Sequence, residues 1–184
     1  MNQTHEAETM ELVSIRALHP EAWAAYKQLR LEALEREPQA FGASYAEAIE
    51  KPDSYWRERL EAVDSVLGPW MLFAESAGSL VGMAGAYADE HGVIWIISVY
   101  VTASERGCGV ARRLMEAVLG QIASTSAVTR VSLMVNKSQS IAVALYSSLG
   151  FRVKGEVPVT LGDGNLHEEY IMEKALALEN NGDA

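Results

Sequence analysis

The sequence predicts an α/β protein, with an α+β mixed sheet covered by helices, and three observations support this prediction. The run 93–101 is apolar on both of its faces, which is typical of a buried central strand. A glycine turn and a helix-periodic run follow it, and the next strand-like run at 129–135 predicts a right-handed parallel crossover. Two further pairs of strand-like runs, at 70–87 and 151–172, each flank a turn and predict hairpins.

The first third of the chain predicts one strand and mostly helices. Residues 12–17 alternate apolar and polar, as a half-buried strand does. Residues 21–35 carry apolar side chains at roughly helical spacing. Ser44, followed three residues later by Glu47, has the form of a capping box and predicts the start of a short helix. Asp53 is a suitable cap for another helix, with Trp56, Leu60 and Val63 on its apolar side.

The rest of the chain alternates strands and helices. Gly150 follows the last predicted helix at the position where glycine commonly ends one. The main elements are expected in the order β-α-α-β-β-β-α-β-α-β-β. From residue 70 onward they are strands at 70–75, 80–87 and 93–101, a helix at 107–123, a strand at 129–135, a helix at 139–149, and strands at 151–160 and 166–172.

Composition narrows the classes of protein to consider. A chain of 184 residues favours one domain, expected at 11–175 between a flexible N-terminus (1–10) and a flexible C-terminal tail (176–184). The formal net charge of −10 argues against a nucleic-acid partner, which needs a basic face. No apolar run approaches the roughly 20 residues of a membrane span. A single cysteine fits a reducing compartment, so a cytoplasmic protein is expected.

The segment 105–111, Glu-Arg-Gly-Cys-Gly-Val-Ala, joins the central strand to a helix and predicts an anion site. Two glycines let the backbone approach a ligand, and the first N–H groups of the helix lack intrahelical partners at the positive end of its dipole. A dinucleotide fingerprint needs a third glycine where Arg112 stands, and the Gly-Lys-Ser/Thr of a Walker A loop is absent. The predicted anion site is therefore neither a dinucleotide-binding turn nor a Walker A loop.

The segment 131–151 contains a second group of polar residues. Gln139, Ala142 and Tyr146 follow i, i+3, i+7 spacing, so they share one face of the predicted helix. The small side chain at 142 leaves room beside that face. From spacing alone, Tyr146 is either a core aromatic residue or a polar lining residue of a groove, and both alternatives stay open.

These two segments resemble the GCN5-related N-acetyltransferase (GNAT) superfamily. Residues 106–111 fit its Arg/Gln-x-x-Gly-x-Gly/Ala motif for acetyl-CoA. The second segment resembles its Asn-x-x-Ala-x-x-Leu-Tyr-x-x-x-Gly-Phe pattern, with Ala142, Leu145, Tyr146, Gly150 and Phe151 in register. The resemblance covers residues 70–175 well and 12–65 in outline. Gln139 stands where many members have Asn, and a proline is missing from the loop after the central strand.

The resemblance implies the GNAT fold and an acetyl-CoA-dependent N-acetyltransferase that acts on a primary amine in a ternary complex. The four histidines show no metal-ligand spacing, so no metal is expected. The implied acid is Tyr146, which protonates the departing CoA thiolate, and the N–H of Val99 is the implied oxyanion donor. The implied cofactor-binding residues are Val99, Tyr100 and Val101 along the pantetheine arm, Arg106, Gly107, Cys108, Gly109, Val110 and Ala111 at the pyrophosphate, and Asn136 and Gln139, whose separate roles stay open.

The sequence leaves the base and the acceptor open. An ammonium group must lose a proton before it attacks. Carboxylates or an imidazole near the central and last strands are candidates to take that proton, and a water chain is the alternative. The acceptor is a small amine, an amino acid, or a protein amine; a non-catalytic acyl-CoA sensor and a plain nucleotide-binding module are the rival functions, and a homodimer stays open. The base candidates are Glu75, Asp89, Glu90, His91, Glu168 and Glu169.

Overall fold

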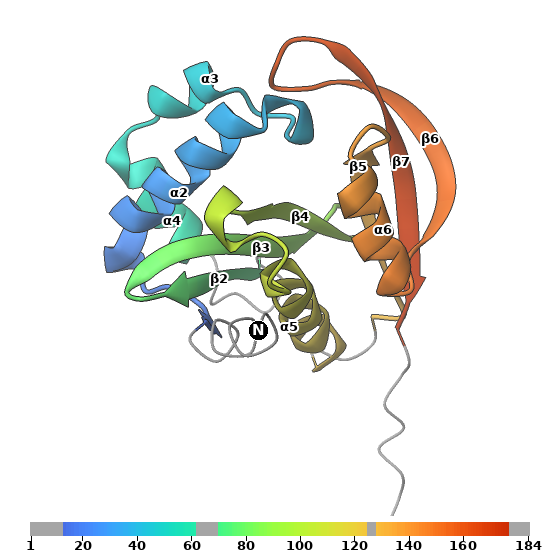
Figure 1. Cartoon of the computed structure of the whole chain (residues 1–184), viewed down its shortest axis with the longest axis horizontal. Coiled ribbons are helices and arrows are strands. Elements are labelled where there is room, and N and C mark those ends of the chain that lie inside the picture. Colours follow the sequence, from blue (N-terminus) through green and yellow to red (C-terminus); the bar gives the residue numbers. More distant parts are fainter. Residues whose placement is uncertain (1–12, 62–69, 125–127, 177–184) are drawn as a thin grey trace, which may run out of the picture.

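The computed structural model describes residues 13–61, 70–124 and 128–176, which form a seven-stranded mixed sheet with helices on both faces (Figure 1). The α/β prediction is confirmed. The predicted flexible end 1–10, most of the predicted tail 176–184, and Leu12 and Val63 lie outside the described residues. Within the described residues, no helix has the length and apolar content needed to span a membrane.

The N-terminal third forms strand β1 (Ser14–Arg16) and then only helices. Ser44 caps α3 as predicted, because its hydroxyl accepts a hydrogen bond from the Glu47 N–H at 3.2 Å. The predicted order of main elements has two helices between the first two strands. The described residues there contain a further helix, α3, which has only five residues. The helical elements are η1 (Pro20–Ala22), α2 (Trp23–Arg36), η2 (Pro38–Ala40), α3 (Tyr45–Ile49) and α4 (Asp53–Glu61).

The middle of the chain forms β2 (Trp70–Ser76), β3 (Ser79–Ala88) and β4 (Ile94–Val101), then the short helix η4 (Ala103–Glu105), helix α5 (Val110–Ser124) and strand β5 (Arg130–Asn136). The strands β4 and β5 pair in parallel, as the crossover prediction requires. The prediction of a helix from residue 107 was wrong by three residues. Gly107 and Gly109 have φ of +79° and +80°, which a right-handed helix cannot contain.

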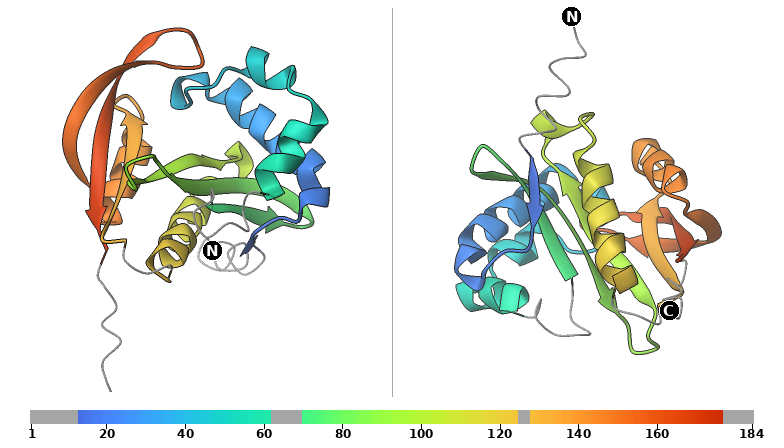
Figure 2. Two further views of the ribbon diagram at one scale, coloured as in Figure 1. Left: turned by 180° about the vertical axis from the view of Figure 1, so that it is seen from behind. Right: turned by 90° about the horizontal axis from the view of Figure 1, so that it is seen from below.

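The C-terminal part contains α6 (Ser140–Ser148) and a hairpin of β6 (Arg152–Thr160) and β7 (Leu166–Ala175). Gly150 ends α6 with φ of +94°, which confirms its predicted role. The strand order is β1-β2-β3-β4-β5-β7-β6, so β7 lies between β5 and β6 and pairs antiparallel with both. The two views of Figure 2 show this hairpin curving away from the α5 side of the sheet.

Two hydrophobic cores lie on opposite faces of the sheet. On one face α5 and α6 cover a core that includes Leu114, Val135 and Tyr146. On the other face α2, α3 and α4 cover a core that includes Trp56 and Phe73. Burial of each such side chain contributes about 1.5–3 kcal/mol to stability. These cores hold the helices against the sheet and leave the end of β4 between them.

Candidate functional site

The glycine turn between η4 and α5 presents backbone groups. Gly107 and Gly109 take positive φ on either side of Cys108, an alternation that directs successive N–H groups toward one concavity. A Cβ at Gly107 would meet no atom within 4 Å, so the space above that residue is open. Helix α5 begins at Val110, and its first N–H groups add the positive partial charge of the helix N-terminus to the turn. A diphosphate fits this turn by charge and by donor type.

The half-exposed side chain of Arg106 binds protein groups, and its expected place near a pyrophosphate stays a prediction. Its Nε donates to the Val101 carbonyl at 2.9 Å, and its Nη2 lies 2.9 Å from Glu37 Oε1. Its guanidinium also lies 5.7 Å from the centre of the Tyr100 ring. The Tyr100 hydroxyl donates to Glu32 Oε1 at 2.8 Å, and burial raises the pKa of Tyr100 to about 12. These contacts fix the turn against α2.

The other two arginines near the turn also bind protein groups. Arg112 donates from Nη2 to the Ser148 hydroxyl at 2.6 Å and so links α5 to α6. Arg113 donates from Nη2 to the Val13 carbonyl at 2.8 Å. Both acceptors are neutral, so these bonds do not cancel the charge of the two guanidinium groups, which adds to that of the turn and the helix N-terminus.

Beyond Ile96, no strand of the described part of the chain lies beside one edge of β4. The parallel ladder with β5 includes only residues 94–96 and 131–133. On the other edge of β4, the N–H of Thr102 donates to the Val81 carbonyl at 2.8 Å. Because N–H groups alternate along a strand, those of Val99 and Val101 point toward the open edge. This edge can pair with an extended chain such as a pantetheine arm.

A β-bulge lies in β4 just before Val99. The register with β3 shifts so that Ser98 and Val99 both stand opposite Ala84, and Ser98 has φ of +58°. A non-glycine residue with positive φ is uncommon and indicates a locally constrained backbone. The bulge re-aims the peptide at 98–99 at the point where the two parallel strands separate.

Tyr146 on α6 combines a buried ring with a hydroxyl that no described group binds. The side chain is 7% exposed, and its ring packs edge-on against Phe151 with centroids 6.1 Å apart. Within the described residues, no group forms a hydrogen bond with this hydroxyl. Burial raises the pKa of Tyr146 well above its usual value, so the phenol keeps its proton at neutral pH. The ring of Tyr146 is therefore part of the core, and a groove lined by its hydroxyl stays a prediction.

Of the other two residues expected on the same face, Ala142 packs at the margin of the α5–α6 core. Gln139 is half-buried and stands at the N-cap of α6, where its side chain makes no capping hydrogen bond. Its N–H donates to the Asn136 carbonyl at 2.9 Å. The proposed contact of Gln139 with the cofactor stays a prediction.

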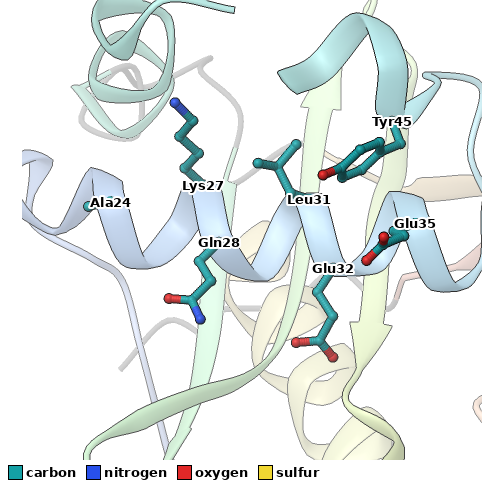
Figure 3. A pocket seen from close by; sticks show the side chains of 7 residues that line it. All are labelled: Ala24, Lys27, Gln28, Leu31, Glu32, Glu35 and Tyr45. Atoms are coloured by element: carbon teal, nitrogen blue, oxygen red, sulfur yellow. The ribbon is translucent and has the colours of Figure 1, made fainter. Parts of the chain in front are cut away.

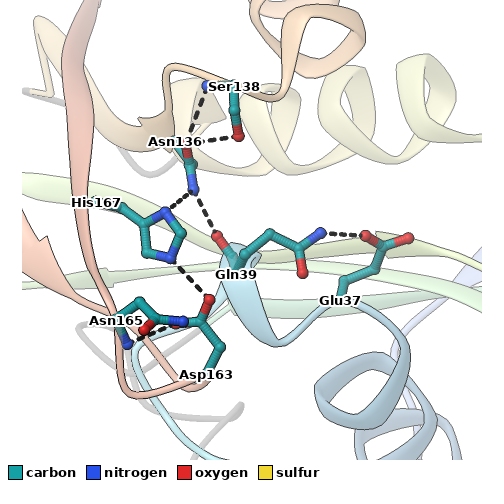
Figure 4. A network of polar contacts seen from close by, with 7 residues as sticks. All are labelled: Glu37, Gln39, Asn136, Ser138, Asp163, Asn165 and His167. Carbon is teal, nitrogen blue, oxygen red and sulfur yellow. Dashed lines mark hydrogen bonds and ion pairs between the residues drawn. The ribbon is translucent and has the colours of Figure 1, made fainter.

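Asn136 is the centre of a buried polar network (Figure 4). Its Oδ1 accepts from the N–H and the hydroxyl of Ser138, at 3.0 and 2.9 Å. Its Nδ2 donates to the Gln39 carbonyl at 3.0 Å and lies 3.1 Å from His167 Nδ1. Asn136 is 3% exposed. Its side chain is fully engaged by protein groups, so its predicted contact with pantetheine would require one of these partners to be exchanged.

His167 extends the network into the loop of the last hairpin. Because Oδ1 of Asn136 faces an obligatory N–H donor, its Nδ2 must be the group that donates to His167 Nδ1. The Nε2–H of the imidazole then donates to Asp163 Oδ2 at 2.8 Å. Sequence reasoning missed this network, because its members lie far apart in the chain; the Asn136–Gln39 contact spans 97 residues.

The base candidates differ in what surrounds them. Glu75 pairs with Arg16 at the outer strand β1. Asp89 accepts from the N–H groups at 91 and 93 and from Trp95 Nε1. The hydrogen bond from Trp95 and those from the two backbone N–H groups lower the pKa of Asp89, which makes it a weaker base. Glu90, His91 and Glu168 are exposed, and only Glu169 is buried, at 5% exposure.

Two shallow hollows line α2, and neither includes the glycine turn or Tyr146. The first, of about 400 Å³, lies along the outer side of α2 beside α3, and Figure 3 shows Glu32, Glu35 and Tyr45 among its lining residues. The second, of about 300 Å³, lies between α2 and the β2–β3 turn. Both are too open to enclose a ligand. Within the described residues there is also no group of His, Cys, Asp or Glu that could hold a metal ion.

Comparison with known proteins gives a consistent result. The model of the acetyltransferase (GNAT) family matches residues 17–151. N-acetyltransferase 8 of Rattus norvegicus is 35% identical over 94 residues, which cover 48% of this chain and 41% of that protein. The matched part therefore spans less than half of that curated relative.

Solved structures share the fold. A GNAT-family acetyltransferase from Streptococcus pneumoniae is 19% identical with a TM-score of 0.77, over 90% of this chain and 99% of that one. A phosphinothricin acetyltransferase from Sinorhizobium meliloti, in complex with acetyl-CoA, is 15% identical with a TM-score of 0.75, over 94% and 92% of the two chains. At these identities the likeness shows the fold alone.

Proposed function

The chain belongs to the acetyltransferase (GNAT) family, and on that premise we propose that it transfers an acetyl group from acetyl-CoA to a primary amine of a small molecule or a protein. The observation that supports this proposal most strongly is the open edge of β4 between a positive-φ glycine turn and an unpaired tyrosine hydroxyl. The turn suits the pyrophosphate of CoA, and the strand edge suits its pantetheine arm. The thioester would then lie near the point where β4 and β5 separate.

Each group has one role in the proposed reaction. The N–H groups of 106–111 bind the pyrophosphate, and the edge at Val99 and Val101 aligns the pantetheine arm. The N–H of Val99, re-aimed by the bulge, donates to the carbonyl oxygen as negative charge develops there. Tyr146 holds its proton at neutral pH and gives it to the CoA sulfur. Direct transfer between two bound substrates makes positioning a large part of the rate.

The acceptor is proposed to carry a positive charge. Across residues 19–61, which include α2 and the loop after it, nine acidic residues stand against six basic ones, and Glu32, Glu35 and Glu37 are among the acids. They would raise the local concentration of an ammonium substrate. The single cysteine supports a reducing compartment such as the cytoplasm.

A calorimetric titration with acetyl-CoA, with CoA as competitor, tests the cofactor. We expect binding of both ligands at one site, and the absence of heat and of any thermal shift would contradict the proposal. A screen of amines that follows CoA release then tests the transfer. Tight CoA binding without release across polyamines, amino acids and peptide amines would instead favour the non-catalytic acyl-CoA sensor.

A further inference from the structure

Glu169 on β7 is a buried residue, 5% exposed, whose carboxylate has no hydrogen-bond or ion-pair partner among the described residues. A buried charge in that state is costly, and folded proteins normally pair it. Its neighbour Glu168, on the same strand, is exposed. An unpaired carboxylate retained inside the fold is therefore a candidate for chemistry.

The register of the sheet places Glu169 at the end of β5. Glu169 pairs directly with Asn136, the last residue of that strand, and paired residues of antiparallel strands have side chains on the same face. Met172 and Lys174 point to the α6 side, since Met172 belongs to the α5–α6 core and Lys174 donates to the Leu149 carbonyl of α6. Alternation then places Glu169 on the opposite face, with His167 and the polar network.

Glu169 and Tyr146 thus stand on opposite faces of the sheet near the place where β4 and β5 separate. Tyr146 belongs to the core between the sheet and α5–α6. The ladder of β4 with β5 ends at Ile96 and Leu133, and Glu169 lies beside the continuation of β5 past that point. A thioester held in the gap would have the proton donor for sulfur on one face and a carboxylate on the other.

The surroundings of Glu169 keep it a usable base. On β7 itself, the neighbouring side chain on the same face is His167, whose imidazole is hydrogen-bonded to Asp163 of the hairpin loop. From β5 Glu169 faces Asn136, and from β6 Val157, and both are neutral. The element η2 lies against Asn136 through the Gln39 carbonyl, and Glu37, the residue just before η2, is paired with Arg106. Burial raises the pKa of Glu169, and the nearby His167 partly opposes that shift.

We propose that Glu169 is the general base that removes a proton from the ammonium group of the acceptor. This inference rests on the proposed N-acetyltransferase function. In this proposal the acceptor enters on the face of the sheet that α2 and the β6–β7 hairpin border. The proposal also requires an acceptor whose amine is protonated when it binds. A buried carboxylate attracts a primary ammonium group and becomes a better base as its pKa rises toward that of the solution.

The protons balance over one turnover. Glu169 takes one proton from R–NH3⁺ and later returns it to solvent. The lone pair of the free amine forms the C–N bond as the carbonyl π pair moves to oxygen. When that pair returns, the C–S bond breaks, and the sulfur takes the proton of Tyr146. The second proton lost by nitrogen restores the Tyr146 hydroxyl, so the products are the amide, CoA–SH and one proton.

The test compares Glu169→Gln with Glu168→Gln in the full chain, using an amine identified by the screen. We expect kcat/KM of Glu169→Gln to fall about 10²–10⁴-fold at neutral pH, with the acid limb of its pH profile lost. Acetyl-CoA affinity should stay unchanged. Glu168→Gln, exposed on the other face of the same strand, should match the wild type in all three measurements.

A stability measurement separates a poor base from a damaged fold. Because the folded protein holds a proton on Glu169 where the unfolded chain has lost it, stability falls as pH rises above about 4.3, and Glu169→Gln should unfold at a higher temperature than wild type at pH 7. Wild-type turnover in Glu169→Gln overturns the base and leaves the proposed function standing. No turnover by wild type with any amine overturns both.

Discussion

The turn at 106–111 and the segment at 136–151 present different kinds of groups to the gap between β4 and β5. The turn offers its backbone, since Gly107 and Gly109 expose N–H groups while the Arg106 side chain binds the Val101 carbonyl and Glu37. The later segment offers a side chain, since the Tyr146 hydroxyl is unpaired while Asn136 is fully engaged. A motif residue therefore does not identify a ligand contact by its type alone. The comparison predicts which substitutions should affect binding and which should affect turnover.

The largest effect is expected from Gly109→Val. Its φ of +80° is strained for a β-branched residue, and a side chain there would occupy the space that the diphosphate needs. We expect acetyl-CoA binding to become undetectable by calorimetry. The matched control is Gly92→Val, because Gly92 also has positive φ, at +76°, in an open turn without a neighbour within 4 Å. Loss of binding in both variants would mean that strain, and not the site, is responsible.

Tyr146→Phe should change turnover and leave binding intact. The substitution removes only the unpaired hydroxyl, so the packing against Phe151 is kept. We expect kcat to fall about 10²–10⁴-fold with acetyl-CoA affinity nearly constant. Steady-state kinetics with a saturating amine measures it. An unchanged kcat would show that water supplies the proton, and the backbone site would stand unaffected.

Asn136→Ala tests the side chain of the second segment that protein groups bind. The change leaves the Ser138 N–H, the Gln39 carbonyl and His167 Nδ1 without their buried partner. We expect a loss of about 1–3 kcal/mol of unfolding free energy in urea titrations. Ser138→Ala, which removes one exposed hydroxyl from the same network, should cost well under half as much. Normal stability but weak acetyl-CoA binding in Asn136→Ala would instead favour a ligand contact.

Arg106→Ala tests the side chain of the first segment that protein groups bind. The guanidinium is about half exposed and binds Glu37 and the Val101 carbonyl, so solvent screens the ion pair. We expect less than about 1 kcal/mol of lost stability and less than a threefold change in acetyl-CoA affinity. A loss of about 1.5–3 kcal/mol in binding would show that Arg106 turns outward to the pyrophosphate.

The smallest effect is expected from acid titration of Asp163 in the hairpin loop. The N–H of Asn165 first, and His167 after it, lower the pKa of Asp163 to about 2. Its contribution to stability is thus present above the unfolded pKa of about 3.9 and is lost as pH falls through about 2. In Asp163→Asn, the urea midpoint should fall less between pH 5 and 2 than in wild type.

The sequence by itself determined the features that depend on neighbouring residues. Glycine spacing located the turn, apolar periodicity located α5 and β4, and Gly150 located the end of α6. Its one clear error, a helix from 107, arose because the same glycines that mark the turn also forbid the helical φ there.

Only the tertiary structure decided the features that depend on distant residues. The placement of β7 between β5 and β6 set Glu169 opposite Asn136, while Glu32 of α2 and Glu37 just after it supplied the carboxylates that bind Tyr100 and Arg106. The physical reason is that burial and side-chain pairing depend on what packs across the sheet, and spacing along one strand cannot specify the partner that another element brings. Glu168 and Glu169 are adjacent acids in the sequence; the pleat of the strand places them on opposite faces, and the packing over those faces leaves one exposed and the other buried.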